Sequence, residues 1–88
     1  MILLANGFEE AFVGIAEQFD KRFAVYDYNK CIMILMQRDD MTLEEAEEWM
    51  GFNVVGAYIG EATPAFVRMM PLSVAYAKEN NVPTGGSE

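Results

Sequence analysis

Thr42-Leu43-Glu44-Glu45 is the stretch that decides the fold, because it predicts where the central helix begins. A threonine three residues before a glutamate forms a capping box, in which each side chain accepts a backbone amide of the other residue. Glu44 and Glu45 also lie in the first turn, where carboxylates interact favourably with the positive end of the helix dipole. We therefore expect a helix that begins at Thr42 and stops at Gly60, since glycine commonly ends helices.

The apolar residues of this helix form two stripes. They are Leu43, Ala46, Met50, Val54 and Ala57 in one stripe, and Trp49, Phe52, Val55 and Ile59 in the other. Because the helix becomes apolar all round after Glu48, its second half is expected at the centre of the core. Gly51 and Gly56 each cost about 1 kcal/mol relative to alanine inside a helix, so a close backbone contact or a local break is expected there.

Upstream of this helix, the sequence predicts a hairpin and a further helix. Residues 11–16 and 22–26 are short segments rich in apolar, β-branched or aromatic types, and residues 17–21 between them are polar enough to turn. Asp27 can cap a helix from Tyr28 to about Gln37, and Arg38 then complements the carbonyls at its C-terminal end.

Downstream, residues 65–69 read as a third strand and residues 71–78 as a short final helix. The order β-β-α-α-β predicts an α+β fold with a small antiparallel sheet of about three strands, covered on one face by two helices. We expect one domain over residues 1–80 and a flexible tail over residues 81–88, where proline, glycine and polar residues gather.

Composition excludes several classes of function. The 88 residues include 14 acidic and 6 basic side chains, which gives a net charge of −8 and disfavours direct nucleic-acid binding. Histidine is absent and Cys31 is the lone cysteine, so histidine-based catalytic triads, Cys/His zinc sites and internal disulfides are ruled out. We expect no catalytic residues, no metal and no cofactor, and hence a protein that is not an enzyme.

The expected compartment is the cytoplasm. The opening residues 1–5 carry no basic side chain before the first polar residues, so no signal peptide is predicted. The longest uncharged run, residues 49–60, has twelve residues, whereas a membrane span needs about 18 to 20. A lone cysteine in an apolar run also suits a reducing environment.

Several motifs together give the chain a resemblance. They are Tyr26-Asp27-Tyr28, Met41-Thr42-Leu43-Glu44-Glu45-Ala46, Phe52-Asn53 and Gly56-Ala57-Tyr58-Ile59-Gly60-Glu61-Ala62-Thr63-Pro64. Over residues 7–67 the chain resembles a group of small uncharacterised proteins encoded by tailed bacteriophages and their bacterial hosts. That group more often has Asp-Gly after the first helix, where this chain has Asp39-Asp40. The resemblance implies a phage or bacterial origin and no particular activity.

The first candidate site is an acidic face around the start of the central helix. It comprises Asp39, Asp40, Glu44, Glu45, Glu47 and Glu48. These carboxylates could bind a basic partner or a divalent cation, but the loop pattern that wraps calcium is missing. The competing interpretation is a solvated helix terminus, and it is the favoured one.

The second candidate site is a polar rim of the sheet. It would combine Tyr26, Asp27 and Tyr28 at the strand-to-helix junction with Asn53, Tyr58, Glu61 and Thr63 near the end of the central helix. If the third strand pairs with the second, the two groups could meet and form a pocket. Each residue also has a sufficient structural role, such as Asp27 as a helix cap or Asn53 as a hydrogen-bonded buried amide.

The function predicted from these features is protein interaction, through the acidic face and through apolar residues that so small a domain cannot bury. The partner would be a host protein or a second copy of the chain. Two alternatives stay open: an acidic mimic of nucleic acid that occupies a basic groove, and a small-ligand-binding domain that uses the polar rim.

Overall fold

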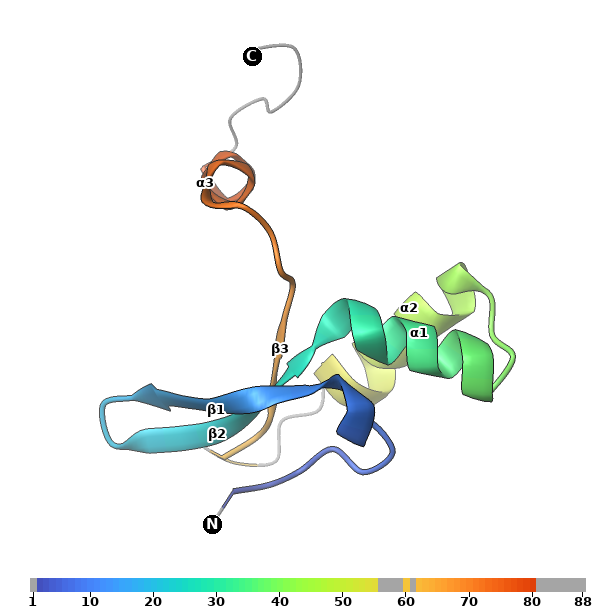
Figure 1. The fold of residues 1–88 in the computed structure, drawn as a ribbon, viewed down its shortest axis with the longest axis horizontal. Helices are drawn as coiled ribbons and strands as arrows, with labels where there is room; N and C mark the ends of the chain where they lie inside the picture. The colour runs from blue at the N-terminus through green and yellow to red at the C-terminus, as the bar shows by residue number, and fades with distance from the viewer. Residues whose placement is uncertain (1, 56–59, 61, 81–88) are drawn as a thin grey trace.

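The computed structural model describes residues 2–55, 60 and 62–80, which form a small α+β fold (Figure 1). In chain order the elements are the 3-10 turn η1 (Glu9–Ala11), β1 (Phe12–Gln18), β2 (Lys21–Asp27), α1 (Tyr28–Arg38), α2 (Leu43–Met50), the π-helical turn η2 (Gly51–Val55), β3 (Ala65–Val67) and α3 (Leu72–Glu79). The predicted α+β class and the order of the elements are confirmed. No helix in these ranges is long and apolar enough to cross a bilayer.

β1 and β2 form the predicted antiparallel hairpin. Gln18 pairs with Lys21, which leaves Phe19 and Asp20 as a two-residue turn. Phe19 has a φ of 57°, a conformation that bulky side chains adopt rarely. Near the other end, a register shift between Phe12 and Gly14 introduces a bulge into β1.

The prediction of a wholly antiparallel sheet is wrong for the third strand. β3 lies beside β2 but runs parallel to it, with Val25 opposite Ala65 and Asp27 opposite Val67. The sheet is therefore mixed, in the order β1-β2-β3. A parallel pair needs a crossover of a dozen or more residues, and the segment that contains α1 and α2 supplies it. The predicted strand 65–69 also ends early, at Val67.

Both predicted helix caps are present. The Lys30 amide donates to the Asp27 carboxylate (3.2 Å) at the start of α1. At the start of α2, the Glu45 amide donates to Thr42 Oγ1 (3.2 Å) and the Thr42 amide donates to the Glu45 carboxylate (2.9 Å). α1 and α2 lie side by side beyond the end of the hairpin, where β2 continues directly into α1 (Figure 1).

The central helix changes character at Gly51, as expected for one of its glycines. α2 ends at Met50 and the chain continues as the wider π-helical turn η2. A Cβ atom on Gly51 would meet nothing within 4 Å, so a local break and not a close contact accounts for this residue. In the described part of the second half, Phe52 is 83% exposed and so does not lie in the core as expected, whereas Val54 packs against the core. Gly56, Ala57 and Ile59 lie outside the described residues.

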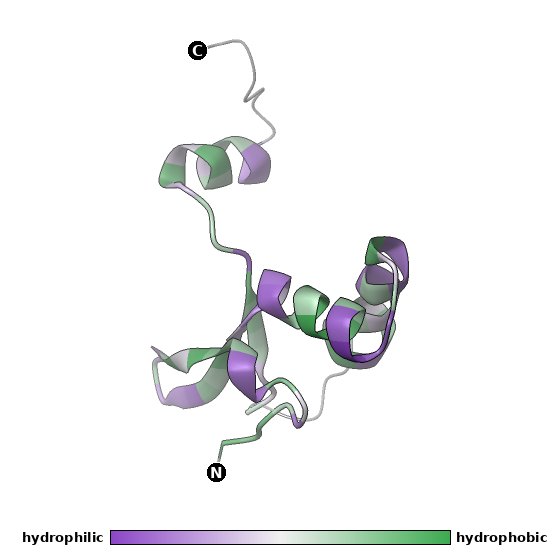
Figure 2. Cartoon of the chain, turned by 45° about the vertical axis from the view of Figure 1, so that its right-hand side comes forward, coloured by the Kyte–Doolittle hydropathy of each residue, from purple (hydrophilic) through white to green (hydrophobic). Residues whose placement is uncertain are grey.

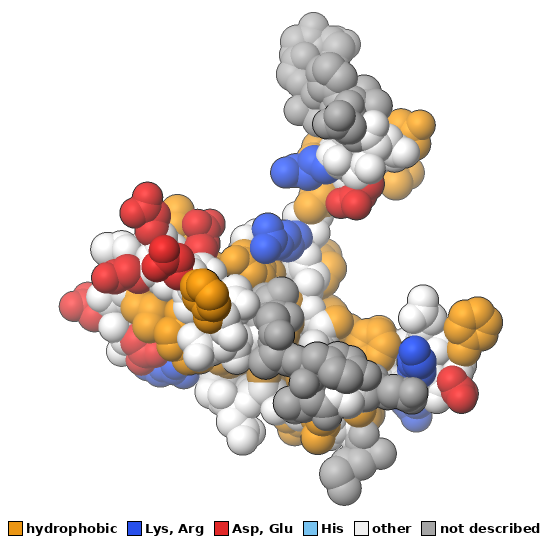
Figure 3. Space-filling model, turned by 180° about the vertical axis from the view of Figure 1, so that it is seen from behind, with side chains coloured by type: hydrophobic (Ala, Val, Ile, Leu, Met, Phe, Trp, Pro, Cys, Tyr) orange, Lys and Arg blue, Asp and Glu red, His pale blue; other side chains and the backbone are white. Residues whose placement is uncertain are grey.

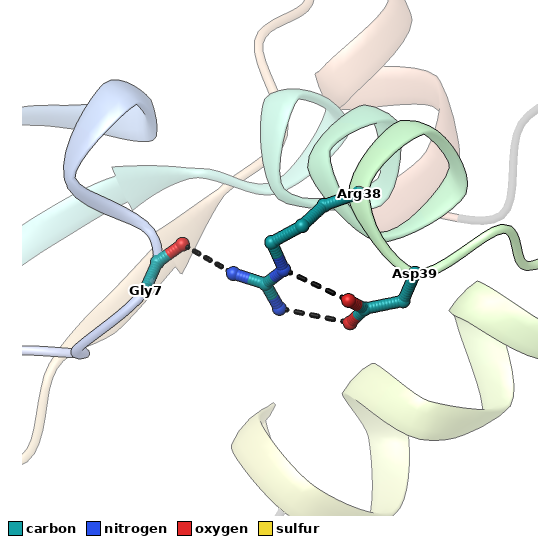
Figure 4. Close-up of polar contacts among 3 residues, drawn as sticks. All are labelled: Gly7, Arg38 and Asp39. Carbon is teal, nitrogen blue, oxygen red and sulfur yellow. Dashed lines mark hydrogen bonds and ion pairs between the residues drawn. The ribbon is translucent and has the colours of Figure 1, made fainter.

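The core lies at the junction of the hairpin with the two helices. Its buried members are Phe8, Ala11, Ala24, Tyr26, Tyr28, Cys31, Ile32, Leu35, Ala46 and Met50. Arg38 ties the N-terminal segment to the end of α1, because its guanidinium donates to the Gly7 carbonyl (2.9 Å) and to the Asp39 carboxylate (Figure 4). Gly7 has a φ of 95°, and a Cβ there would lie 3.0 Å from the same guanidinium, so both conformation and space favour glycine.

α3 follows Pro71 close to the predicted position but takes no part in this core. The chain leaves the sheet after β3, and α3 stands apart from the strands and from the other helices (Figure 1). Its one buried residue, Ala77, does not belong to the core cluster. The predicted flexible tail, residues 81–88, lies outside the described residues.

Candidate functional site

The acidic face forms a wide hollow on the outer side of α2. The hollow has a volume of about 580 Å³ and is lined by Asp39, Asp40, Met41, Glu45, Glu48, Trp49, Phe52 and Asn53. Seen from behind, acidic side chains gather over α2 and surround hydrophobic ones (Figure 3). The structure thus brings four of the six predicted carboxylates together with two aromatic side chains, while Glu44 and Glu47 do not line the hollow.

Two of the carboxylates have structural partners. Asp39 accepts two hydrogen bonds from Arg38, at 3.0 and 2.9 Å, and this interaction holds the pKa of its carboxyl below the usual range. Glu45 belongs to the capping box of α2. Within the described residues, the other four acids of the face make no ion pair and no side-chain hydrogen bond: Asp40, Glu44, Glu47 and Glu48. These four supply the negative charge that is free to meet a ligand.

The aromatic part of the face consists of Trp49 and Phe52. Trp49 is partly buried, and its ring lies 6.1 Å from that of Phe8 in the core. Phe52 lies in η2 and leaves most of its surface in solvent. Phe52 was not expected at the surface, because its position in the apolar pattern of the helix predicts a core residue. Gly51, directly before it, was the one signal that the helical spacing would not continue.

The chemistry available to this face is electrostatic and aromatic. The described residues contain no group of three or more histidine, cysteine, aspartate or glutamate side chains arranged to hold a metal. Carboxylates next to aromatic rings attract ammonium and guanidinium groups, because the charge is complementary and the ring faces carry negative potential. The face therefore suits lysine or arginine side chains that approach together with apolar neighbours.

At the polar rim, the structure gives the first group of predicted residues structural roles. Tyr26 is buried, its hydroxyl accepts a hydrogen bond from the Ala5 amide (2.9 Å), and its ring stacks on that of Phe66. Asp27 caps α1. Tyr28 is also buried, with the guanidinium carbon of Arg68 4.0 Å from its ring centroid.

The second group of rim residues is only partly described. Asn53 and Thr63 line one cavity of about 230 Å³ between the N-terminal segment, α2 and the start of β3. Asn53 is exposed and donates to the Trp49 carbonyl (3.1 Å), so its expected role as a buried amide is wrong. Tyr58 and Glu61 lie outside the described residues. The cavity is smaller than the roughly 300 to 1,000 Å³ usual for small-molecule sites.

Cys31 lies in the core. It is fully buried, and burial raises the pKa of its thiol to about 11, with a smaller contribution from the charge of Asp27. A thiol with so high a pKa is almost entirely protonated at neutral pH and is therefore a poor nucleophile.

Apolar surface is abundant elsewhere. Thirteen large apolar side chains of the described residues are exposed, more than the eleven apolar residues that are buried, so the exposed apolar surface expected of so small a domain is present.

Comparison of the chain with protein-family models, with curated proteins and with solved structures found no match in any of the three.

Proposed function

We propose that this chain is a small, non-enzymatic interaction protein that binds a basic protein partner through the α2 face. The α2 face is defined here as Asp40, Glu44, Glu47, Glu48, Trp49 and Phe52. The sequence predictions of a bacteriophage or bacterial origin and of a cytoplasmic location belong to the same proposal. The partner would then be a protein of the bacterial cell.

One observation carries the proposal: Phe52 is 83% exposed and lines a hollow that four carboxylates also line, namely those of Asp39, Asp40, Glu45 and Glu48. A solvated helix terminus explains acidic side chains but gives no reason to expose a phenylalanine among them. Aromatic residues that are exposed inside a charged ring are typical of binding hot spots, where a central apolar contact is surrounded by polar groups.

The same observation distinguishes this function from a nucleic-acid mimic. A mimic needs carboxylates that take the place of phosphates, and its binding depends on charge alone. The α2 face has an apolar centre as well, so part of its binding free energy should survive high salt. Small-ligand binding is less favoured, because the rim cavity is small and Tyr26, Asp27 and Tyr28 do not line it.

The test is capture of partners from a bacterial lysate by the immobilised chain, at low and at high salt. One variant replaces the four free acids of the face: Asp40→Asn, Glu44→Gln, Glu47→Gln and Glu48→Gln. Glu45 stays, because it caps α2. A matched control replaces four exposed acids elsewhere, namely Glu10→Gln, Glu17→Gln, Asp20→Asn and Glu79→Gln; of these, Glu17 forms an exposed ion pair with Arg22 (3.5 Å). Both variants change the net charge from −8 to −4.

A basic protein that is captured by the native chain and by the control, but not by the α2-face variant, supports the proposal. Capture that disappears entirely at high salt with the native chain indicates the mimic instead. Equal capture by both charge variants places the binding surface elsewhere and contradicts the proposal.

A further inference from the structure

Among the described helices and strands, none packs extensively on α3. Leu72 and Tyr76 are 83% and 63% exposed, and their spacing of four residues places them on one side of the helix. An isolated helix shorter than about 12 residues is marginal in water, so eight residues need tertiary contacts to stay helical. The apolar surface of α3 therefore needs a second surface to cover it.

The segment that leads into α3 is anchored so that the helix points away from its own sheet. Phe66 in β3 stacks on Tyr26, with the ring centroids 5.7 Å apart, and the guanidinium of Arg68 lies over the ring of Tyr28. No helix or strand interrupts residues 68–71, which lead away from the hairpin to α3 (Figure 1). We call residues 68–80 the arm.

The sheet has an open surface that α3 could cover, because part of the face that carries the core residues has no helix packed on it. Ile15 lies opposite Ala24 and Phe12 opposite Tyr26, and directly opposed residues of an antiparallel pair point to the same face. Ala24 and Tyr26 are buried, yet Phe12 and Ile15 remain 45% and 42% exposed. On this face the side chains of β2 are covered, whereas those of β1 stay partly open.

The hairpin tip shows a second unusual feature. Phe19 is fully exposed and has a positive φ, a position for which glycine or asparagine is the usual residue. Neither burial nor turn geometry accounts for phenylalanine here, whereas contact with another molecule does. Figure 2 shows hydrophobic residues both on the hairpin and on α3.

From these features we infer that two copies of the chain form a two-fold symmetric dimer in which the arm of each copy lies on the hairpin of the other. One chain has both a helix that lacks a sheet and a sheet face that lacks a helix, and an exchange between two copies satisfies both needs. This surface is separate from the α2 face.

The exposed area agrees with a dimer of this kind. The large exposed side chains of the arm are Met69, Met70, Leu72 and Tyr76, and those of the hairpin are Phe12, Val13, Ile15 and Phe19. At about 200 Å² for each fully exposed large side chain, the eight together offer on the order of 1,000 Å² of apolar surface per copy. Stable interfaces bury about 800 Å² per partner, whereas the arm alone offers only on the order of 500 Å². Pairing of arm with hairpin can therefore cover about twice the apolar surface that pairing of arm with arm can cover, and it reaches the size of a stable interface.

The first experiment is sedimentation equilibrium of the full chain and of two single variants. The native chain should associate to twice its mass of 9.9 kDa. Tyr76→Asp should weaken this association about 100-fold, because a symmetric dimer loses the contact twice. Ser73→Asp adds the same charge to the same helix one residue after Leu72 and should leave the association unchanged. A native chain that is monomeric at all concentrations overturns the inference.

Cross-linking identifies which surfaces meet. One chain carries Ile15→Cys and another carries Tyr76→Cys, and the two are mixed and oxidised; the native Cys31 is buried and does not interfere. A disulfide-linked product that contains one chain of each kind supports the exchanged arm. Predominant pairing of Tyr76→Cys chains with one another indicates arm-to-arm contact and overturns the inference. The α2-face variant should dimerise normally, so failure of the proposed function and failure of the dimer are separable.

Discussion

Tyr26 offers a direct test of how the fold is stabilised, because its ring and its hydroxyl contact different segments of the chain. The ring contacts Phe66 in β3 and Phe12 in β1, at centroid distances of 5.7 and 5.6 Å. The hydroxyl accepts the Ala5 amide and so attaches the N-terminal segment to the sheet. Tyr26→Phe removes only the second of these interactions.

We expect Tyr26→Phe to lower the free energy of unfolding by about 1 kcal/mol, the usual contribution of one hydrogen bond whose donor is partly buried. In a domain of this size, that loss lowers Tm by roughly 4 to 8 °C. Tyr26→Leu should cost about 2 to 4 kcal/mol, because each aromatic pair adds about 0.5 to 1.5 kcal/mol beyond the area it buries.

The assay is urea unfolding followed by circular dichroism, together with hydrogen exchange of the Ala5 amide. Ser73→Ala is the control, since it removes an exposed hydroxyl outside the core and should change stability by less than about 0.5 kcal/mol. Exchange at Ala5 should accelerate in Tyr26→Phe, while exchange at Ala24 follows only the global stability. Equal stability of Tyr26→Phe and the native chain, with unchanged exchange at Ala5, would refute this account of the N-terminal segment.

Three further predictions concern the caps, the hairpin turn and the acid limb of stability. Thr42→Ala removes the α2 cap and should lower the free energy of unfolding by about 1 kcal/mol, measured by urea unfolding; an unchanged midpoint would show that the cap contributes nothing. Phe19→Gly relieves the positive φ and should raise stability by up to about 1 kcal/mol in the monomeric Tyr76→Asp background, and a loss of stability there would contradict the strained turn. The pKa of Asp39 is lowered chiefly by its hydrogen bonds with Arg38. The ionised carboxylate therefore makes its full contribution to the free energy of unfolding above the usual aspartate range near pH 4, and this contribution is lost as the pH falls through the lower pKa of the folded state. In Asp39→Asn the urea midpoint should therefore fall less between about pH 5 and pH 2 than in the native chain, and an identical acid limb would count against the Arg38 interaction.

The helix starts could be predicted from the sequence because their signals are local. Asp27 and Thr42 each act on an amide three residues further along the chain, so the residue types and their spacing contain the whole interaction. The hairpin was predictable for a similar reason, since the two strands lie next to each other in the sequence.

The direction of β3 could not be predicted in this way. Whether Ala65–Val67 runs parallel or antiparallel to β2 depends on the path of the 37 residues between the two strands. The sequence of a three-residue strand does not indicate its direction. The separation of α3 from the rest of the fold could not be predicted either. An apolar helix looks the same in the sequence whether it packs against its own chain or against another one.

The acidic residues of the candidate site could be predicted from the sequence, but the exposed aromatic residue among them could not. The acids were visible as a cluster, and the structure brings four of the six to the lining of one hollow. Phe52 was assigned to the core because an apolar residue at helical spacing normally faces inward. The π-helical turn that begins at Gly51 alters that spacing, and the ring remains at the surface.

The most direct test of the proposed function is capture of the partner by Phe52→Ser at high salt, compared with Leu43→Ser. Both substitutions remove an exposed apolar side chain from the same region, but only Phe52 lines the acidic hollow. If the α2 face binds as proposed, Phe52→Ser loses the partner and Leu43→Ser keeps it. Retention of the partner by Phe52→Ser would contradict the claim that this aromatic residue forms the centre of the binding surface.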